Sequence, residues 1–98
     1  MAIPEIFVDL VWQKGQVVLG NDPAFWRKDS CGAWIGKQFY GSRNSPYGWE
    51  IDHIRPVSSG GGDELPNLRP LQWENNAHRQ NGWLACKVVS VGTQNVSA

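Results

Sequence analysis

Apolar and polar residues alternate most regularly in the middle of the chain, over residues 47–54. This segment is rich in aromatic and β-branched side chains, and a period of two in such a segment indicates a β-strand. The strand would place Trp49, Ile51 and His53 on one face. Pro56 is expected to end it, because proline has no amide hydrogen to donate to a strand ladder.

The residues after this strand complete a compact unit. Residues 58–66 are polar and rich in glycine, which predicts a loop that reverses the chain. Residues 68–71 are sufficient only for a brief return strand. Residues 72–80 have the composition of a helix, which Asn81 and Gly82 are expected to end. The pattern therefore predicts a strand, a long turn, a short strand and a helix, in other words a ββα unit.

The flanking segments are less regular. Residues 3–19 consist of short apolar patches separated by polar residues and glycine, which favours short strands or arm-like segments over a long helix. Asp22 and Pro23 can open a helical turn, because Asp caps helices and Pro suits the first helical position. Residues 83–91 are apolar and β-branched enough for one more strand. Residues 92–98 are expected to form a flexible, frayed tail.

Length and composition favour one domain that spans residues 1–98. The chain has 98 residues, of which 41% are hydrophobic and 18% charged, so it can build one small core. Six Trp, three Phe and two Tyr predict that a few large side chains supply much of the buried area. The expected fold is α+β, with the ββα unit at residues 47–81 and additional short strands towards both ends.

The charge balance bears on possible partners. The formal net charge is zero, which argues against a protein that binds nucleic acid through a general basic excess. Four basic residues nevertheless gather between positions 27 and 43, namely Arg27, Lys28, Lys37 and Arg43, against Asp29 alone. Local basic surfaces are therefore compatible with the sequence.

Cysteine usage and the first residues bear on location. The two cysteines, Cys31 and Cys86, lie far apart and in no Cys-x-x-Cys arrangement, so neither a disulfide scaffold nor a zinc ribbon is indicated. We expect both thiols to be reduced and Cys31 to be a small buried side chain. The first residues lack a basic segment typical of a signal peptide, and no stretch approaches a membrane span. The expected location is the cytoplasm, with no membrane contact.

The most informative chemistry lies at Asp52, His53, Asn67 and Asn76. A carboxylate beside an imidazole, followed by carboxamides, can support metal-assisted phosphodiester hydrolysis. Neighbouring residues of a strand point to opposite faces, so Asp52 and His53 can flank one phosphate but can hardly bind the same ion. Asp52 and Asn76 offer the oxygen ligands that suit Mg²⁺ or Mn²⁺. His53 would accept a proton from the attacking water, a role suited to imidazole.

These residues stand in a pattern that resembles the signature of the HNH endonucleases, in its Asp-His, Asn, Asn version. The resemblance implies a ββα-metal nuclease that cuts DNA with one divalent ion, and it implies that Asn67 hydrogen-bonds across the loop and keeps His53 in register. Many members of that family carry paired cysteines that bind a structural zinc. This chain lacks the pairs, so no structural zinc is expected. The matching segments are Trp49–Ser58, Gly60-Gly61, Asn67–Leu71 and Asn75-Asn76.

The likeness covers about residues 49–80, and a looser similarity upstream suggests a small bacterial or phage-like HNH subgroup. The upstream segments are Trp12, Asp22-Pro23, Trp26–Asp29 and Cys31–Ile35.

Other polar residues near the motif have two interpretations each. Four arginines are candidates for DNA binding, because guanidinium groups match phosphate oxygens, but they could instead form surface ion pairs with Glu50, Asp63, Glu64 or Glu74. Glu50 is either an acceptor that assists the metal site or a plain surface carboxylate. Asn75 and His78 are expected to be exposed helix residues. The four arginines are Arg43, Arg55, Arg69 and Arg79.

The expected function is that of a DNA endonuclease that nicks with low sequence specificity. No helix-turn-helix, zinc finger or long basic helix is evident that could read base edges, and one active site cuts one strand per encounter. Two alternatives stay open: a noncatalytic nucleic-acid-binding module on a ββα scaffold, and a ribonuclease that uses the same site. The sequence is compatible with a monomer or a homodimer.

Overall fold

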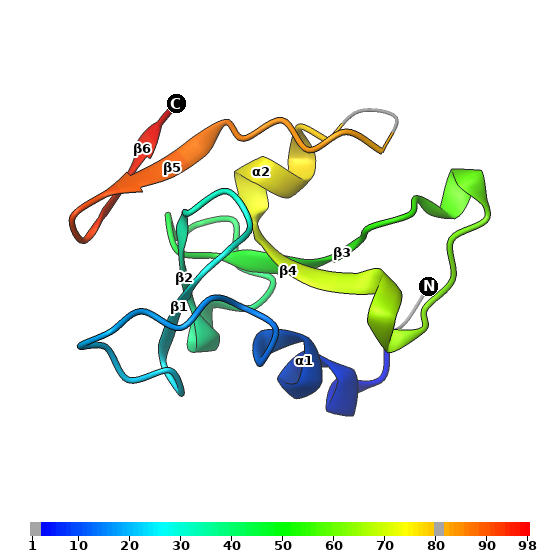
Figure 1. The fold of residues 1–98 in the computed structure, drawn as a ribbon, viewed down its shortest axis with the longest axis horizontal. Helices are drawn as coiled ribbons and strands as arrows, with labels where there is room; N and C mark the ends of the chain where they lie inside the picture. Colours follow the sequence, from blue (N-terminus) through cyan, green and yellow to red (C-terminus); the bar gives the residue numbers. More distant parts are fainter. Residues whose placement is uncertain (1–2, 80–81) are drawn as a thin grey trace.

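The computed structural model describes residues 3–79 and 82–98, which form a small α+β domain. Its strands pair into three separate two-stranded antiparallel sheets, β1–β2, β3–β4 and β5–β6 (Figure 1). The main elements are α1 (Glu5–Trp12), β1 (Trp26–Lys28), β2 (Trp34–Gly36), β3 (Trp49–His53), β4 (Leu68–Gln72), α2 (Trp73–Ala77), β5 (Val88–Val91) and β6 (Gln94–Ser97). Three short 3-10 turns occur at Lys37–Phe39, Val57–Ser59 and Leu65–Asn67.

The β3–β4 hairpin lies at the centre of the molecule. The strand pairing joins Trp49 to Gln72 and His53 to Leu68, so the predicted strand and its return strand are confirmed. Helix α2 follows β4 without a linker and packs against both strands. It begins after Gln72, whose side-chain Oε1 accepts hydrogen bonds from the Glu74 and Asn75 amides and so caps the helix.

Helix α2 is shorter than predicted. It ends at Ala77, with His78 as the capping residue, and does not extend over residues 72–80. Asn81, which was expected to end it, lies outside the described residues.

The expectation of short strands over residues 3–19 is wrong for its first half. Helix α1 occupies Glu5–Trp12 and buries Val11 and Trp12. Phe7 and Val8 lie one helical turn earlier on the same face and pack against the same core. The helix covers only about two turns and is followed by Gln13, Lys14 and Gly15, so it is too short for a period of 3.6 residues to stand out in the sequence.

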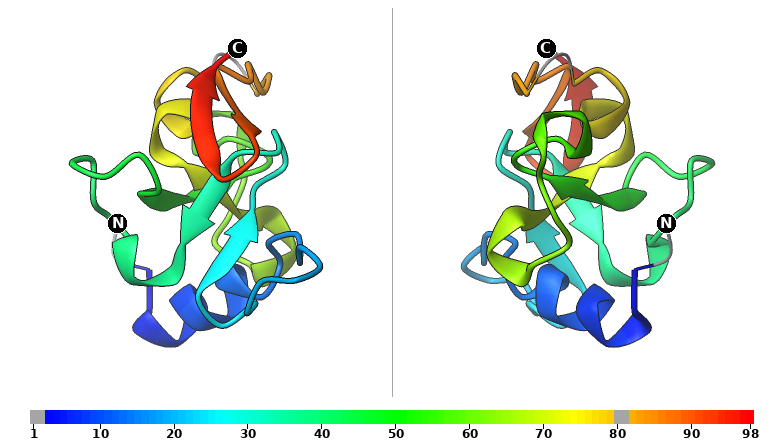
Figure 2. Two further views of the ribbon diagram at one scale, coloured as in Figure 1. Left: turned by 90° about the vertical axis from the view of Figure 1, so that its left-hand side faces the viewer. Right: turned by 90° about the vertical axis from the view of Figure 1, so that its right-hand side faces the viewer.

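The hydrophobic core joins the segments on either side of the central hairpin. The indole rings of Trp12 and Trp49 pack with their centroids 5.3 Å apart. Ile35 from β2 and Leu68 from β4 complete this cluster and are fully buried. Helix α1 thus covers one end of the molecule, while the β5–β6 hairpin lies at the other end (Figure 2). Within the described part of the chain, no helix is both long and apolar enough to cross a membrane.

The C-terminal segment differs from the expected frayed tail. Residues 94–97 form β6, which pairs with β5 along its whole length. Only residues 88–91 of the predicted strand 83–91 are extended in this pairing. The side chain of Asn95 anchors the hairpin, because it accepts from the Trp34 amide at 2.7 Å and donates to the Trp34 carbonyl at 2.9 Å. A polar tail sequence gave no sign of these long-range bonds.

The cysteines also differ from expectation. Cys31 and Cys86 form a disulfide across 55 residues, with their Cα atoms 5.4 Å apart, so the prediction of two reduced thiols is wrong. Cys31 is partly exposed and is not a buried hydrophobic residue. Sequence spacing could not show this pair, because disulfide formation depends on the distance between the two residues in the fold.

Candidate active site

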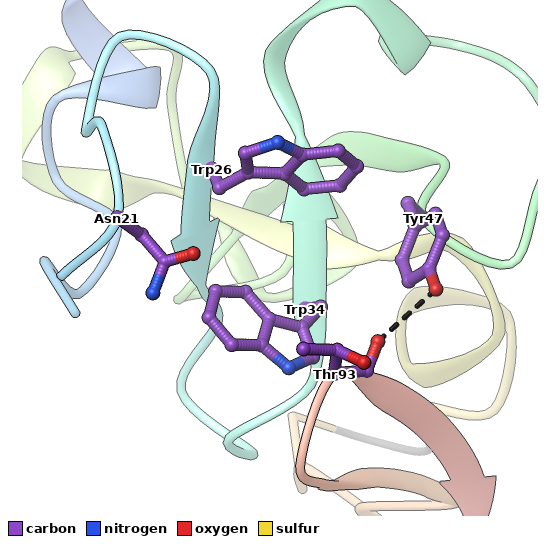
Figure 3. Close-up of a pocket in the computed structure, with 5 residues that line it drawn as sticks. All are labelled: Asn21, Trp26, Trp34, Tyr47 and Thr93. Atoms are coloured by element: carbon purple, nitrogen blue, oxygen red, sulfur yellow. Dashed lines mark hydrogen bonds between the residues drawn. The ribbon is translucent and has the colours of Figure 1, made fainter.

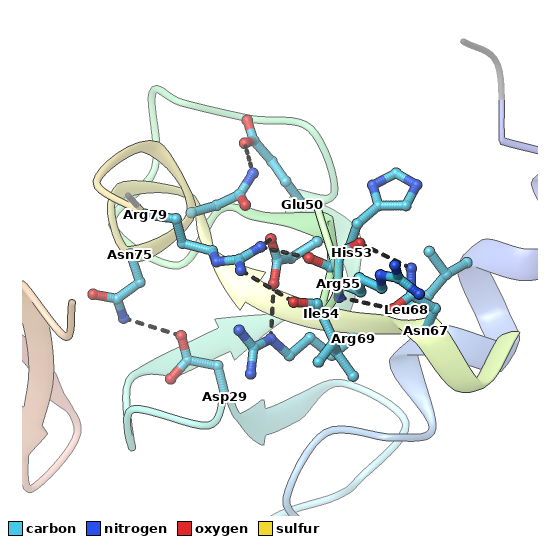
Figure 4. A network of polar contacts seen from close by, with 12 residues as sticks. Asp29, Glu50, His53, Ile54, Arg55, Asn67, Leu68, Arg69, Asn75 and Arg79 are labelled. Atoms are coloured by element: carbon cyan, nitrogen blue, oxygen red, sulfur yellow. Dashed lines mark hydrogen bonds and ion pairs between the residues drawn. The ribbon is translucent and has the colours of Figure 1, made fainter. Parts of the chain in front are cut away.

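Asp52 is the most deeply placed of the predicted site residues. Its side chain is only 5% exposed, and both carboxylate oxygens accept hydrogen bonds from arginines. Arg69, its direct partner across the hairpin, donates from Nε to Oδ2 at 2.8 Å. Arg79, which follows α2, donates from Nη1 to Oδ1 at 2.5 Å (Figure 4). The two guanidinium groups compensate the cost of burying this charge.

Glu50 lies on the same face of β3 as Asp52, because the two residues are separated by one position. Asn76 of α2 donates from Nδ2 to Glu50 Oε1 at 2.9 Å. Arg43 donates to the same carboxylate from Nε at 2.7 Å and from Nη2 at 2.9 Å. These bonds from Arg43, more than the one from Asn76, hold the pKa of Glu50 below its usual value against the opposing effect of burial.

His53 ends β3 and lies on the opposite face. Its Nε2 is 2.7 Å from Oδ1 of Asp63, a residue of the loop between β3 and β4, and its side chain is 22% exposed. A carboxylate only accepts hydrogen bonds, so we assign the ring proton to Nε2, which leaves Nδ1 as an acceptor. Sequence reasoning considered Asp63 only as a partner for arginine and missed this contact, because the loop fold sets it.

Asn67 ties the loop together. Its Oδ1 accepts from the Arg55 amide at 2.8 Å, and its Nδ2 donates to the carbonyls of Arg55 at 3.1 Å and Gly62 at 2.8 Å. Gly61 makes this closure possible, because a Cβ atom there would lie 1.8 Å from the Arg55 carbonyl oxygen. The bonds across the loop expected of Asn67 are therefore present, directly beside the end of β3.

The predicted metal ligands are each bonded to other groups of the protein. Asp52 is held by Arg69 and Arg79, whereas Asn76 bonds to Glu50, and the described residues show no hydrogen bond between Asp52 and Asn76. Across residues 3–79 and 82–98, no three His, Cys, Asp or Glu side chains cluster as a metal site. The donor types still suit a hard divalent cation, since two carboxylates and one carboxamide extend from the hairpin face and the helix packed on it.

The four predicted DNA-binding arginines are all engaged within the protein. Arg43 forms the expected kind of ion pair with Glu50, whereas Arg69 and Arg79 pair with Asp52, a partner that sequence reasoning did not consider. Arg55 donates from Nε to the Ser59 carbonyl at 2.9 Å within its own loop. Arg43 and Arg55 are thus the two that lie at the surface.

Two neighbours of the site have purely structural contacts. Asn75, expected to be exposed, is fully buried, donates to Asp29 Oδ2 at 3.0 Å and exchanges two hydrogen bonds with the backbone of Val88. Asn75 lies on the face of α2 that is turned towards β5, and the sequence alone could not show that β5 packs there. His78 is exposed as expected, and its Nδ1 lies 2.9 Å from the Glu74 carbonyl oxygen.

Comparison with known proteins found no relative of this chain. No protein-family model matches the chain, and neither a characterised protein nor a solved structure is significantly similar to it.

Proposed function

We propose that this chain is a metal-dependent DNA endonuclease of the HNH type, with a ββα-metal site on the β3–β4 hairpin and α2, which nicks with little sequence preference. The observation that carries the proposal is the Asn67 closure. Its carboxamide binds Arg55 and Gly62 across the loop and fixes the end of β3, where His53 projects with one ring nitrogen held by Asp63. A partly exposed imidazole, oriented beside a loop that Asn67 holds closed, suits proton transfer.

His53 acts as the general base in this proposal. The Asp63 carboxylate accepts a hydrogen bond from Nε2–H, so Nδ1 carries the lone pair that receives a proton from the attacking water. The same carboxylate then stabilises the imidazolium that forms and keeps the ring in its orientation, as paired carboxylates do in other hydrolases. Asn67 acts as a positioning residue, because the hydrogen bonds of its side chain to described residues all go to the loop backbone.

Asp52 and Asn76 are the residues proposed to hold one Mg²⁺ or Mn²⁺, with Glu50 as a third oxygen donor beside Asn76. When bound, such an ion polarises a phosphate oxygen and stabilises charge on the leaving oxygen. The proposal requires Arg69 and Arg79 to release Asp52, since both of its oxygens are taken. The released guanidinium groups can then bind phosphate, and Arg43 and Arg55 add contacts at the surface.

Plasmid relaxation with Mg²⁺ or Mn²⁺, and with EDTA as the metal-free control, tests the proposal. We expect nicked circles only with metal. His53→Ala should lower the rate by about 10²- to 10⁴-fold, the usual contribution of a positioned base. Asp63→Asn should lower it by about 10- to 100-fold, because the imidazole loses its orienting carboxylate.

His78→Ala and Glu64→Gln serve as matched controls, since both residues are exposed and, within the described part of the chain, neither forms a hydrogen bond or ion pair with His53. Both variants should cut as wild type does. Normal cutting by His53→Ala, or cutting that survives EDTA, would refute the assignment.

The second candidate is a noncatalytic nucleic-acid-binding module, favoured by the pairing of Asp52 with two arginines. A protein of this kind would bind DNA but leave plasmid intact with every divalent metal. A parallel assay on labelled RNA distinguishes the third possibility, a ribonuclease.

A further inference from the structure

An aromatic pocket lies on the β1–β2 hairpin and shares no residue with the candidate active site. It has a volume of about 300 Å³. Trp26 and Trp34 face it from two sides, Tyr47 closes one end, and Asn21 directs its carboxamide towards it from the opposite end (Figure 3). Thr93, from the turn between β5 and β6, forms the remaining edge.

The rings that line this pocket are fixed by contacts within the protein. Trp26 meets Tyr47 edge-on, with centroids 5.1 Å apart and an interplanar angle of 84°. Trp34 is buried and donates from Nε1 to the Gly92 carbonyl at 2.7 Å, while the Tyr47 hydroxyl donates to the Thr93 carbonyl at 3.1 Å. A ligand would therefore find a largely preformed site and lose less entropy in ordering it.

The charges around the pocket indicate what charge a bound ligand should carry. Among the described residues that line it there is no Asp or Glu, and the Lys28 ammonium lies 4.8 Å from the centroid of the Trp34 ring. A cationic ligand would be repelled by Lys28 and would find no carboxylate. A flat, uncharged ring that carries a nearby negative charge fits better, because it can stack on indole while its charge approaches the lysine.

A second cavity, which Lys28 lines, lies between the aromatic pocket and the candidate active site. It has a volume of about 240 Å³, and its lining includes three basic residues, Lys28, Lys14 and Arg69, and one acidic residue, Asp29. Arg69 is also a partner of Asp52. Lys28 thus lies between the aromatic pocket and the surface that leads to Asp52, which is a suitable path for a phosphate backbone.

We propose that the pocket binds one unpaired nucleobase of a nucleic-acid strand, stacked on Trp26 and packed against the buried Trp34, with its edge on Asn21 and its phosphate near Lys28. The Asn21 carboxamide offers the donor and acceptor that a base edge requires. This inference rests on the proposed function in one respect, because the bound strand is taken to be the substrate of the nuclease.

The test measures strand binding without cleavage. Anisotropy of an end-labelled oligodeoxyadenylate is titrated with His53→Ala protein in EDTA, single-stranded and annealed to its complement. The single strand should bind more tightly than the duplex. Adding Trp26→Ala should weaken single-strand binding by about 5- to 150-fold, the range that corresponds to the loss of one base stack. Trp26→Phe should restore most of the affinity, and Asn21→Ala should cause a smaller loss.

Trp83→Ala is the matched control, because Trp83 is 78% exposed and does not line the pocket. An equal loss in Trp83→Ala, or wild-type affinity in both Trp26→Ala and Asn21→Ala, would overturn the inference. A competition experiment on the His53→Ala protein tests the inference even if Trp26→Ala does not fold. Adenosine monophosphate should displace the oligonucleotide. Displacement by choline and not by adenosine monophosphate would overturn the inference and assign the pocket to a cation.

Failure of this inference is distinguishable from failure of the proposed function. If wild-type protein cuts plasmid but strand binding does not depend on the pocket, only the base site is wrong. If no plasmid is cut while Trp26→Ala still loses strand affinity, the base site stands and the nuclease proposal fails.

Discussion

At the residue scale, the pairing of Asp52 with Arg69 and Arg79 is the feature that most affects the proposed chemistry. A carboxylate that is 5% exposed needs compensating charge, and two guanidinium groups provide it. The same groups occupy the oxygens that a divalent cation would need. Arginine and cation should therefore compete for Asp52.

The first prediction follows from this competition. Arg69→Gln should strengthen Mn²⁺ binding by about 10-fold, equivalent to about 1.4 kcal/mol, because glutamine can still donate to Asp52 but carries no charge. Isothermal calorimetry measures the affinity. Arg55→Gln is the control, since the Arg55 guanidinium donates to the Ser59 carbonyl and not to a proposed metal ligand. Unchanged or weaker Mn²⁺ binding in Arg69→Gln would count against Asp52 as a ligand.

The second prediction concerns pH and Glu50. Hydrogen bonds from Arg43 are the main cause that lowers the pKa of Glu50 below 4.5, so the ionised form is favoured in the folded protein. This contribution is present above pH 4.5 and is lost as the pH falls through the lowered pKa. Thermal unfolding of wild type and Arg43→Gln should therefore differ most near neutral pH and converge in acid. A difference that grows as the pH falls would contradict this sign.

At the element scale, Asp29 joins the β1–β2 turn to the β4–α2 junction. One carboxylate oxygen accepts from the Cys31 and Ala33 amides, and the other accepts from the Gln72 amide and from Asn75. Asp29 is 1% exposed, so these four bonds replace its contact with water. Asn75 then extends the connection to β5, which explains how short two-stranded sheets hold together around one small core.

The third prediction separates the two adjacent asparagines of α2. Asn75→Ala should lower the free energy of unfolding by about 1–3 kcal/mol, because it leaves buried partners unsatisfied. Urea denaturation measures this. Asn76→Ala, at a partly exposed neighbouring position, should cost less stability but more metal affinity. A larger loss of stability in Asn76→Ala would show that the assignment of the two roles is reversed.

At the scale of the whole molecule, the Cys31–Cys86 disulfide and Asn95 hold the C-terminal hairpin against the rest of the domain. This hairpin supplies Gly92 and Thr93, which bond to Trp34 and Tyr47 at the aromatic pocket. The pocket therefore depends on segments from both ends of the chain. The cytoplasmic location stays a prediction. A structural disulfide is typical of oxidising compartments and argues against that location.

The fourth prediction is that reduction destabilises the molecule. Opening a loop that spans 55 residues should cost about 4 kcal/mol if the effect is mainly entropic. Reductant should lower the melting temperature of wild type and leave Cys31→Ser/Cys86→Ser, already lowered, unchanged. Mass spectrometry after alkylation of the unfolded, unreduced protein should find no modified cysteine. Two alkylated cysteines in the unfolded, unreduced protein would argue against the disulfide.

The sequence by itself determined the central hairpin. Period-two alternation at residues 47–54 and the glycine-rich loop depend on neighbouring residues, and β3 and β4 were confirmed where these local patterns placed them. The bonds of Asn67 across that loop were expected from the resemblance to the HNH signature, and they are present. Such features are visible in sequence because backbone geometry and turn chemistry act over a few positions.

Only the tertiary structure decided which polar groups meet. Asp52 with its two arginines, His53 with Asp63, Asn75 with Asp29, and Cys31 with Cys86 are pairs separated along the chain by 10 to 55 residues. A buried charge or donor takes the partner that packing brings within reach, and no local pattern records that distance. The same holds for α1 and β6, whose short segments are stabilised by the core and by Asn95 rather than by their own periodicity.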